Sequence, residues 1–276
     1  MFTLNCKGTL LTLDRPAVMG IINVNNNSFF KNSRHASIDD ALNTAKKMLE
    51  EGATFLDVGG QSTSPESLAA TAFEELERVV PTIEAIIKEF PETIISIDTF
   101  YAEVAKAAVN AGAKIVNDIS AGDLDNQMLE TVAALDVPFI AMHMKGTPQT
   151  MKNLSQYENV TREVLDYFIK KIDECNKAGI KDVIVDVGFG FAKNIAQNFE
   201  LMKNLSIFKM LEKPLLVGVS RKSTIYKTLH TTPENALNGT TVLNTVALQN
   251  GANIIRVHDV KEAMEAVTLL EKLEAF

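Results

Sequence analysis

Residues 182–188, DVIVDVG, form a short apolar run that ends in an aspartate and a glycine. The same unit, a run rich in Val and Ile followed by polar or glycine residues, recurs about eight times along the chain. The other runs are 17–24 (AVMGIINV), 54–60 (TFLDVGG), 94–99 (IISIDT), 114–120 (KIVNDIS), 138–144 (PFIAMHM), 214–220 (PLLVGVS) and 253–259 (NIIRVHD). They lack a clean alternation of apolar and polar residues, which is typical of parallel strands covered on both faces.

Amphipathic helical patterns that close at a glycine separate these runs, as in residues 99–112 and 161–179. Strand–helix units repeated in this way over about 250 residues predict an α/β fold of the (β/α)8 TIM-barrel type. An open doubly wound sheet is the alternative. No linker rich in Pro or Ser divides the chain, so we expect one barrel domain over residues 18–276. Residues 1–17 predict an added N-terminal β-hairpin that plugs the bottom of the barrel.

The composition excludes several classes of protein. The chain has 276 residues, of which 46% are hydrophobic, and a net charge of −8, which argues against nucleic acid as a partner. No stretch approaches the roughly 20 apolar residues of a membrane span, and the N-terminus does not resemble a secretory signal. Two cysteines, Cys6 and Cys175, give no disulfide framework. We therefore expect a reducing, cytoplasmic setting.

Polar residues at the strand ends are the candidates for function, because the active site of such a barrel lies at the C-terminal ends of its strands. They are Asn23, Asp57, Asp98, Asn117, His143, Asp186, Ser220, Arg221, Lys222, Arg256 and His258. Asp57 can equally pair with a neighbour, and a barrel histidine such as His143 is more often hydrogen-bonded than catalytic. No HExxH or CxxC pattern points to a transition metal. GFGFAK, residues 188–193, lacks the third glycine of a dinucleotide-binding fingerprint.

Two groups among these candidates indicate the chemistry of a ligand. Cationic side chains gather after the last two strands, where this fold commonly holds a phosphate; they are Arg221, Lys222, Arg256 and His258. Asp98, Asn117 and Asp186 offer acceptors that suit a flat heterocycle with adjacent amino and ring N–H groups. An anion and such a heterocycle in one pocket describe a pterin with a phosphate ester, although spacing alone does not single out that ligand. Neutralisation of the two aspartates by the cations is the structural alternative.

The motifs of the chain, taken together, resemble those of the dihydropteroate synthase family. The matching pieces are MGIINV and NSF (19–24 and 27–29), DVGGQST.P (57–65), SIDT (96–99), IVNDIS (115–120), MHMKGTPQTM (142–151), GFGF (188–191), GVSRKS (218–223) and IIRVHDV (254–260). The resemblance runs from about residue 18 to the end. It implies a (β/α)8 transferase of folate biosynthesis, usually a homodimer, that joins dihydropterin pyrophosphate to p-aminobenzoate and releases pyrophosphate. It also implies that Mg²⁺ takes part and that sulfonamides compete with p-aminobenzoate.

The resemblance assigns a role to each matching position. Asp98, Asn117, Asp186 and Lys222 would bind the pterin, with Arg256 stacked on its ring. The pyrophosphate would be held by Asn23, Arg256 and His258, and Asn23 would also contact Mg²⁺. The p-aminobenzoate would be bordered by Phe29, Thr63, Pro65, Lys222 and Ser223. Asp98, Lys222 and Arg256 would form the catalytic group in a displacement resembling SN1, in which the bond to pyrophosphate breaks before the arylamine attacks.

Two loops depart from the family pattern. Asn-Val-Thr-Pro-Asp-Ser-Phe is usual after the first strand, and here Asn25, Asn26 and Asn27 replace Thr, Pro and Asp. In the next loop, the usual Ser-Thr-Arg-Pro-Gly has Ser64 in place of arginine and Glu66 in place of glycine. One loop thus lacks a carboxylate and the other a guanidinium. Loss of both members of an ion pair can be nearly neutral where loss of one is costly.

These departures leave two further functions open beside an active synthase. A pterin-binding paralogue without synthase activity would keep the pocket but not the turnover. A methyltetrahydrofolate-dependent methyltransferase would also bind a pterin, but it would have little use for Asn23, Arg256 and His258 as a diphosphate-binding set.

Restoring both loop charges tests whether they were lost as a pair. Asn27→Asp combined with Ser64→Arg is expected to raise the synthase rate more than either change alone, because contacting residues give non-additive effects. Steady-state kinetics of the two single variants and the double variant measure this. Additive or harmful effects would count against a coupled loss.

Overall fold

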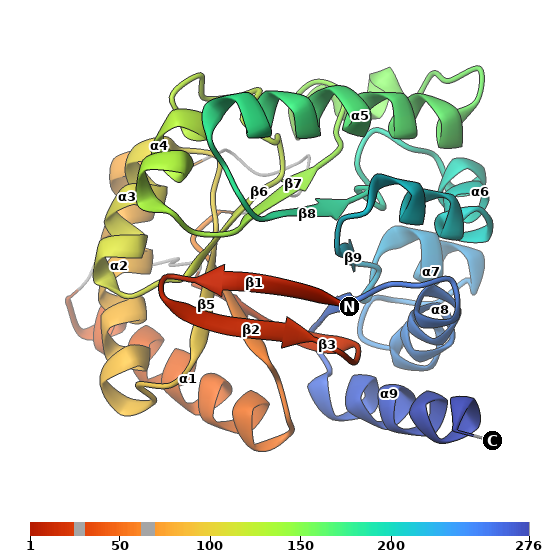
Figure 1. The fold of residues 1–276 in the computed structure, drawn as a ribbon. Coiled ribbons are helices and arrows are strands. Elements are labelled where there is room, and N and C mark those ends of the chain that lie inside the picture. The colour runs from red at the N-terminus through yellow and green to blue at the C-terminus, as the bar shows by residue number, and fades with distance from the viewer. Residues whose placement is uncertain (25–30, 62–69, 276) are drawn as a thin grey trace.

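The computed structural model describes residues 1–24, 31–61 and 70–275, and its centre is a closed barrel of eight parallel strands (Figure 1). The barrel strands are β3 (Ala17–Asn23), β4 (Phe55–Gly59), β5 (Ile94–Asp98), β6 (Ile115–Asp118), β7 (Phe139–Met142), β8 (Val183–Asp186), β9 (Leu215–Val217) and β10 (Ile254–Val257). They follow chain order around the barrel, and β10 pairs with β3 to close it. Each predicted apolar run contains one of these strands. The (β/α)8 prediction is therefore confirmed, and the open doubly wound sheet is wrong.

Helices surround the barrel and cover the outer faces of its strands (Figure 1). They are α1 (Lys31–Glu50), α2 (Ala72–Glu89), α3 (Ala102–Ala111), α4 (Met128–Leu135), α5 (Val160–Ala178), α6 (Ile195–Lys203), α7 (Ser223–Thr228), α8 (Leu237–Gln249) and α9 (Val260–Glu274), with 3-10 turns η1 (Met151–Leu154) and η2 (Leu205–Leu211). Local sequence sets their ends: Thr71 and Glu74 form a capping box at the start of α2, and Gly179 ends α5 in the left-handed conformation. In the described part of the chain, no helix combines the length and apolarity needed to span a bilayer.

The inward faces of several strands change from apolar to polar along their length. Side chains two positions apart point to the same side of a strand, so Phe55 is followed inside the barrel by Asp57, and Ile254 by Arg256. The apolar layer at the amino-terminal ends of the strands is buried in one cluster of Ala17, Met19, Phe55, Ile94, Ile115, Ile140, Ile184, Leu216 and Ile254. The polar residues lie at the opposite ends, where the fold places active sites.

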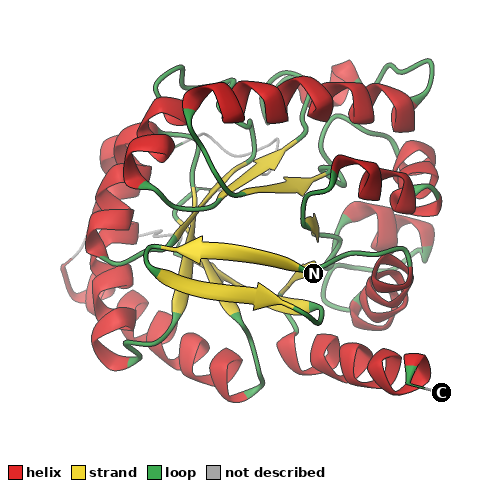
Figure 2. Cartoon of the chain, in the orientation of Figure 1, coloured by secondary structure: helices red, strands yellow, loops and turns green. Residues whose placement is uncertain are grey.

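An antiparallel hairpin of β1 (Phe2–Cys6) and β2 (Thr9–Leu13) covers the amino-terminal end of the barrel. Figure 2 shows it across the middle of the ring of helices. Its buried Leu4, Cys6 and Leu13 belong to the same cluster as the apolar layer of the strands. The backbone N–H of Asn5 also donates to Oδ2 of Asp182 at the start of β8, at 2.7 Å. The hairpin predicted for the first residues thus acts as a plug.

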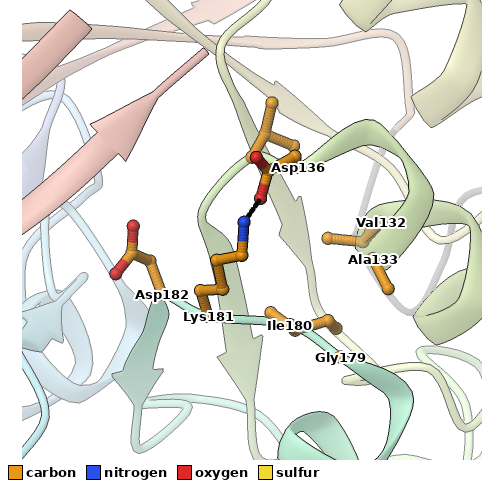
Figure 3. A pocket seen from close by; sticks show the side chains of 8 residues that line it. Val132, Ala133, Asp136, Gly179, Ile180, Lys181 and Asp182 are labelled. Atoms are coloured by element: carbon orange, nitrogen blue, oxygen red, sulfur yellow. Dashed lines mark ion pairs between the residues drawn. The ribbon is translucent and has the colours of Figure 1, made fainter. Parts of the chain in front are cut away.

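A small pocket lies beside this end of the barrel, between α4, the C-terminus of α5 and the start of β8 (Figure 3). Lys181 and Asp136 form an exposed ion pair of 2.7 Å at its edge. The cavity measures about 10 Å³, which is at the lower limit for holding one water molecule. This cavity is too small for a substrate. We therefore expect the active site at the opposite rim, at the carboxyl ends of the strands.

The plug should contribute to stability through its buried face. Leu4 is 1% exposed and Leu10, in the same hairpin, is 73% exposed. Leu4→Ala should lower the free energy of unfolding by about 2–5 kcal/mol because it leaves a cavity in the core, whereas Leu10→Ala should change it by less than about 0.5 kcal/mol. Urea denaturation measures both values. Equal effects would show that the hairpin does not belong to the barrel core.

Candidate functional site

The strand register aligns several candidate residues along one rim of the barrel. Asn23 lies beside Gly59, Gly59 beside Asp98, and Asp98 beside Asn117. On the other side of the rim, Asp186 ends β8 next to Met142 of β7. Four of the predicted residues thus lie at the carboxyl ends of strands in a single closed sheet.

Arg256 connects β10 to two carboxylates across the barrel interior. Its Nε donates to Oδ2 of Asp57 at 2.6 Å, and its Nη2 donates to Oδ2 of Asp98 at 2.7 Å. Asn117 Nδ2 donates to the same Asp57 oxygen at 3.1 Å. Asp57 is fully buried, so its charge depends on these donors for compensation. The sequence alternative that Asp57 pairs with a neighbour is therefore correct.

The single guanidinium of Arg256 binds two carboxylates, so negative charge exceeds positive charge in this group. This excess affects the pKa values of its members. Burial raises the pKa of Asp98 to about 7, and the negative charge of Asp57 adds to the rise, although the charge of Arg256 opposes it. The pKa of Arg256 is raised despite its burial, because the two aspartates surround it. Arg256 therefore stays a cation, and Asp98 is the group whose charge can change near neutral pH.

Lys222 and Asp186 form the second charged pair of the rim. Nζ of Lys222 donates to the carbonyl oxygen of Phe189 at 2.7 Å and lies 4.8 Å from the centre of the Phe191 ring. Burial lowers the pKa of Lys222 to about 8, against the opposing effect of Asp186. Burial raises the pKa of Asp186, while Lys222 and the N–H of Gly188, which donates to Oδ1 at 2.8 Å, oppose the rise. Burial thus shifts the pKa of each group toward its neutral form, and their opposite charges reduce both shifts.

A groove of about 1010 Å³ extends from Lys222 over α6 and α7. Its lining includes Phe189, Phe191, Lys193, Lys222 and Ser223. A cavity of this size, lined by three aromatic side chains and by several cationic ones, has the character of a site for a small anionic molecule.

Several known proteins are similar to this chain in sequence and in fold. The sequence profile of the pterin binding enzyme family matches residues 19–258. The dihydropteroate synthase of Escherichia coli is 43% identical over 267 residues, covering 96% of this chain and 94% of that protein. The dihydropteroate synthase of Xanthomonas albilineans with 4-aminobenzoic acid has a TM-score of 0.91 and 38% identity, covering 99% of this chain and 98% of the other. The Yersinia pestis dihydropteroate synthase in a sulfonamide drug complex has a TM-score of 0.93 and 39% identity, covering 100% of both chains.

The chain belongs to the dihydropteroate synthase family. Its polar rim lies at the carboxyl ends of the barrel strands, where enzymes of this fold have their active sites. The structure brings together Asp98, Asn117, Asp186, Lys222 and Arg256 there. Ser223 begins α7 and is half-buried at the groove.

The remaining predicted residues of this family member fall into two groups. Asn23 is exposed at the end of β3, and His258 is exposed just after β10, with its Nδ1 2.9 Å from Ser220 Oγ. Phe29, Thr63 and Pro65 lie outside the described residues, as do the substituted positions Asn25, Asn26, Asn27, Ser64 and Glu66.

Arg221 does not belong to the anion-binding set predicted from the sequence. Its guanidinium forms a bidentate pair with Asp259, with both contacts at 2.8 Å, and donates to the carbonyl oxygens of Pro233 and Glu234. The residue has a positive φ of 54°, which turns the chain between β9 and α7. Sequence proximity to Lys222 was misleading, because neighbouring side chains in a turn point in different directions.

The sequence missed one buried cation of this family member. Lys193 is 8% exposed, and its Nζ lies 2.9 Å from His143 Nδ1. Burial lowers the pKa of His143 to about 2, and the charge of Lys193 adds to the effect, so this imidazole stays neutral. The interpretation of His143 as a hydrogen-bonded barrel histidine is confirmed. The sequence does contain a signal for this buried cation, because Lys193 follows the apolar stretch GFGFA. The glycine spacing of a dinucleotide fingerprint does not reveal it.

The raised pKa of Asp98 predicts a pH dependence of stability. The folded pKa of about 7 exceeds the unfolded value of about 4, so the contribution of this group to stability is lost as the pH rises between those values. Asp98→Asn removes that loss. The free energy of unfolding of the variant relative to wild type should therefore increase from pH 4 to pH 8, by at least the ~1.4 kcal/mol of one pKa unit.

Urea denaturation of both proteins across this range measures the difference. Asp173→Asn, at an exposed aspartate paired with Lys177, is the matched control and should show no such increase. A constant difference between Asp98→Asn and wild type would contradict the assignment.

Proposed function

We propose that this chain is a dihydropteroate synthase that condenses 6-hydroxymethyl-7,8-dihydropterin pyrophosphate with p-aminobenzoate to give 7,8-dihydropteroate and pyrophosphate. The observation that carries the proposal is the joint placement of Asp98, Asn117, Asp186, Lys222 and Arg256 at one rim of a chain of this family. The relatives that match nearly the whole chain are synthases, which favours this function over a paralogue without turnover or a methyltransferase.

The pterin is proposed to lie against the carboxylates of the rim. Asp186 has one oxygen held by the Gly188 N–H, and its other oxygen remains for an N–H of the pterin. Asp98 and Asn117 supply further polar contacts, and Lys222 donates to a ring acceptor. Arg256 is fixed by Asp57 and Asp98, so that its planar guanidinium can stack on the ring without losing its partners.

The diphosphate is proposed to bind at Asn23, Arg256 and His258. In the described part of the chain Nη1 of Arg256 makes no hydrogen bond, so this edge of the guanidinium can meet a phosphate oxygen. Asn23 is exposed at the rim and carries a neutral amide oxygen, a hard donor that suits Mg²⁺. Among the described residues no cluster of three or more His, Cys, Asp or Glu could hold a metal.

That donor set fits a Mg²⁺ ion that is bound chiefly by the substrate phosphates, with Asn23 as its protein ligand. When bound, the ion neutralises charge on the leaving diphosphate.

The proposed reaction resembles an SN1 displacement. The C–O bond between the pterin methylene and the diphosphate breaks, and its electron pair leaves with pyrophosphate. The arylamine nitrogen then attacks the methylene cation and loses a proton. Asp98 and Asp186 place negative charge beside the ring where positive charge develops, while Arg256 and His258 orient the leaving group. The proposed catalytic group consists of Asp98, Lys222 and Arg256.

The p-aminobenzoate is proposed to lie at the outer side of the groove. Its border would be formed by Phe29, Thr63, Pro65, Lys222 and Ser223, of which Lys222 and Ser223 line the groove. The Xanthomonas albilineans relative binds 4-aminobenzoic acid and the Yersinia pestis relative occurs with a sulfonamide drug. Competitive inhibition by sulfonamides is the corresponding proposal for this chain.

A homodimer in the reducing cytoplasm is also proposed. Helices α8 and α9 expose apolar side chains, with Val242 at 53%, Leu269 at 71% and Leu273 at 67% exposure. Cys6 and Cys175 are free thiols in buried positions, which is compatible with a reducing setting. Light scattering of the purified protein tests the dimer, since the chain mass is 30.2 kDa.

Pyrophosphate release by the purified protein tests the function. Release should require dihydropterin pyrophosphate, p-aminobenzoate and Mg²⁺ together, and should disappear in Asp98→Ala. Tight pterin binding without turnover would instead support a pterin-binding paralogue. Methyl transfer from methyltetrahydrofolate would support a methyltransferase.

Asp186→Ala is expected to weaken pterin binding by about 10- to 100-fold, because a hydrogen bond to a charged group contributes about 1.5–3 kcal/mol. Isothermal titration calorimetry with the dihydropterin measures the change. Asp173→Ala, at an exposed helix position, is the control and should bind as wild type does. Unchanged affinity in Asp186→Ala would remove this residue from the pterin site.

A further inference from the structure

Lys193 is a buried ammonium at the edge of the site to which the synthase reaction gives no role. Its Nζ donates to the carbonyl oxygens of Gly188 and Phe191, each at 3.0 Å, and to that of His143 at 3.2 Å. His143 Nδ1 lies at 2.9 Å as a fourth neighbour. Among the described residues no carboxylate lies within ion-pair distance of this nitrogen. The cation is therefore compensated by backbone dipoles and an imidazole.

The segment 188–191 lies between two lysines that hold different carbonyl groups. Gly188 and Phe191 direct their carbonyl oxygens to Lys193, and Phe189 directs its carbonyl oxygen to Lys222 at 2.7 Å. The N–H of Gly188 donates to Asp186 at 2.8 Å. One short segment thus presents a donor to one pterin-site residue and an acceptor to another.

Gly188 makes this arrangement possible because only glycine suits its place. Its φ is 71°, in the region that side chains disfavour, and a Cβ there would collide with the carbonyl oxygen of His143. The segment therefore packs directly on the end of β7, and Lys193 bridges the two backbones at their closest approach.

We propose that Lys193 is a positioning residue for the pterin site: its ammonium joins the end of β7 to segment 188–191 and thereby orients Asp186 and Lys222. This inference rests on the proposed function of those two residues. Lys193 acts through the Gly188 N–H on Asp186 and through the Phe189 carbonyl on Lys222.

The electrostatics of the neighbourhood support this role. Asp186 faces Lys222 of the α7 start and Arg256 of β10, together with Lys193 from its own loop, and all three cations lower its pKa against the effect of burial. Burial lowers the pKa of Lys193 to about 7, against the effect of Asp186, and the charges of Lys222 and Lys145 add to the fall. Asp186 must be ionised to accept N–H groups of the pterin, so pterin binding is lost as the pH falls through its pKa. Loss of Lys193 should therefore move this loss of binding to higher pH.

Lys193→Met tests the proposal, since it keeps the length of the side chain and removes its charge and donors. Dihydropterin affinity at pH 6, where Lys193 is a cation, should fall about tenfold, and the pH at which binding is half lost should rise by at least about half a unit. Lys193→Arg keeps a cation and should return that pH toward the wild-type value.

Lys171→Met is the matched control, because Lys171 is also buried, at 5% exposure, but binds Asp123 and Glu174 on the outside of the barrel. It should lower the thermal midpoint without changing the pH profile. If Lys193→Met also lowers only the midpoint, the role is structural and the proposal is overturned. Absence of dihydropterin binding by wild type would instead reject the proposed function.

The wild-type protein offers a test that needs neither a folded variant nor the proposed function. Nitrogen NMR of the histidine side chains should show His143 neutral, with its proton on Nε2 and an unprotonated Nδ1 that accepts from Lys193. A proton on Nδ1 would make Nζ of Lys193 the acceptor of that contact, which requires a neutral amine, and would overturn the proposed ammonium bridge.

Discussion

The guanidinium of Arg256, held between Asp57 and Asp98, is the interaction on which the polar rim depends. Asp57 is fully enclosed, and a buried carboxylate without a partner is strongly unfavourable. Arg256 supplies that partner and reaches Asp98 with a second nitrogen. The ends of β4, β5 and β10 are thus joined through charged hydrogen bonds across the barrel interior. A planar group fixed in this way can contact a ligand with its face and its remaining edge.

In the closed barrel, apolar residues that stabilise the fold lie toward the amino-terminal ends of the strands, and the polar residues of the site lie toward the carboxyl ends. Five of the eight strands (β4, β5, β6, β8 and β10) contribute an apolar side chain near the amino end and a polar one two residues later, as Phe55 and Asp57 illustrate. The hairpin of β1 and β2 seals the apolar end with Leu4, Cys6 and Leu13. Charged groups with perturbed pKa values, which destabilise a fold, are gathered at the other end, where function requires them.

The backbone of segment 188–191 accepts hydrogen bonds from two lysines, Lys193 and Lys222. Lys222 donates to the Phe189 carbonyl oxygen, whereas Lys193 lies against His143. Both lysines donate to carbonyl oxygens and not to Asp186, whose carboxylate has one hydrogen bond, from the Gly188 N–H, in the described part of the chain. The glycine at position 188 permits the close approach on which this division depends.

The sequence by itself determined the strands, the closed fold and the rim positions of Asp98, Asn117, Asp186 and Lys222. These follow from local periodicity and from the rule that active sites lie at the carboxyl ends of barrel strands. Only the tertiary structure decided which charges meet. Arg256 and Asp57 are 199 positions apart, Arg221 turns to Asp259, and Lys193 meets His143, which follows β7. Such contacts depend on register, barrel closure and the direction of each turn, and none of these is encoded in the spacing of a short motif.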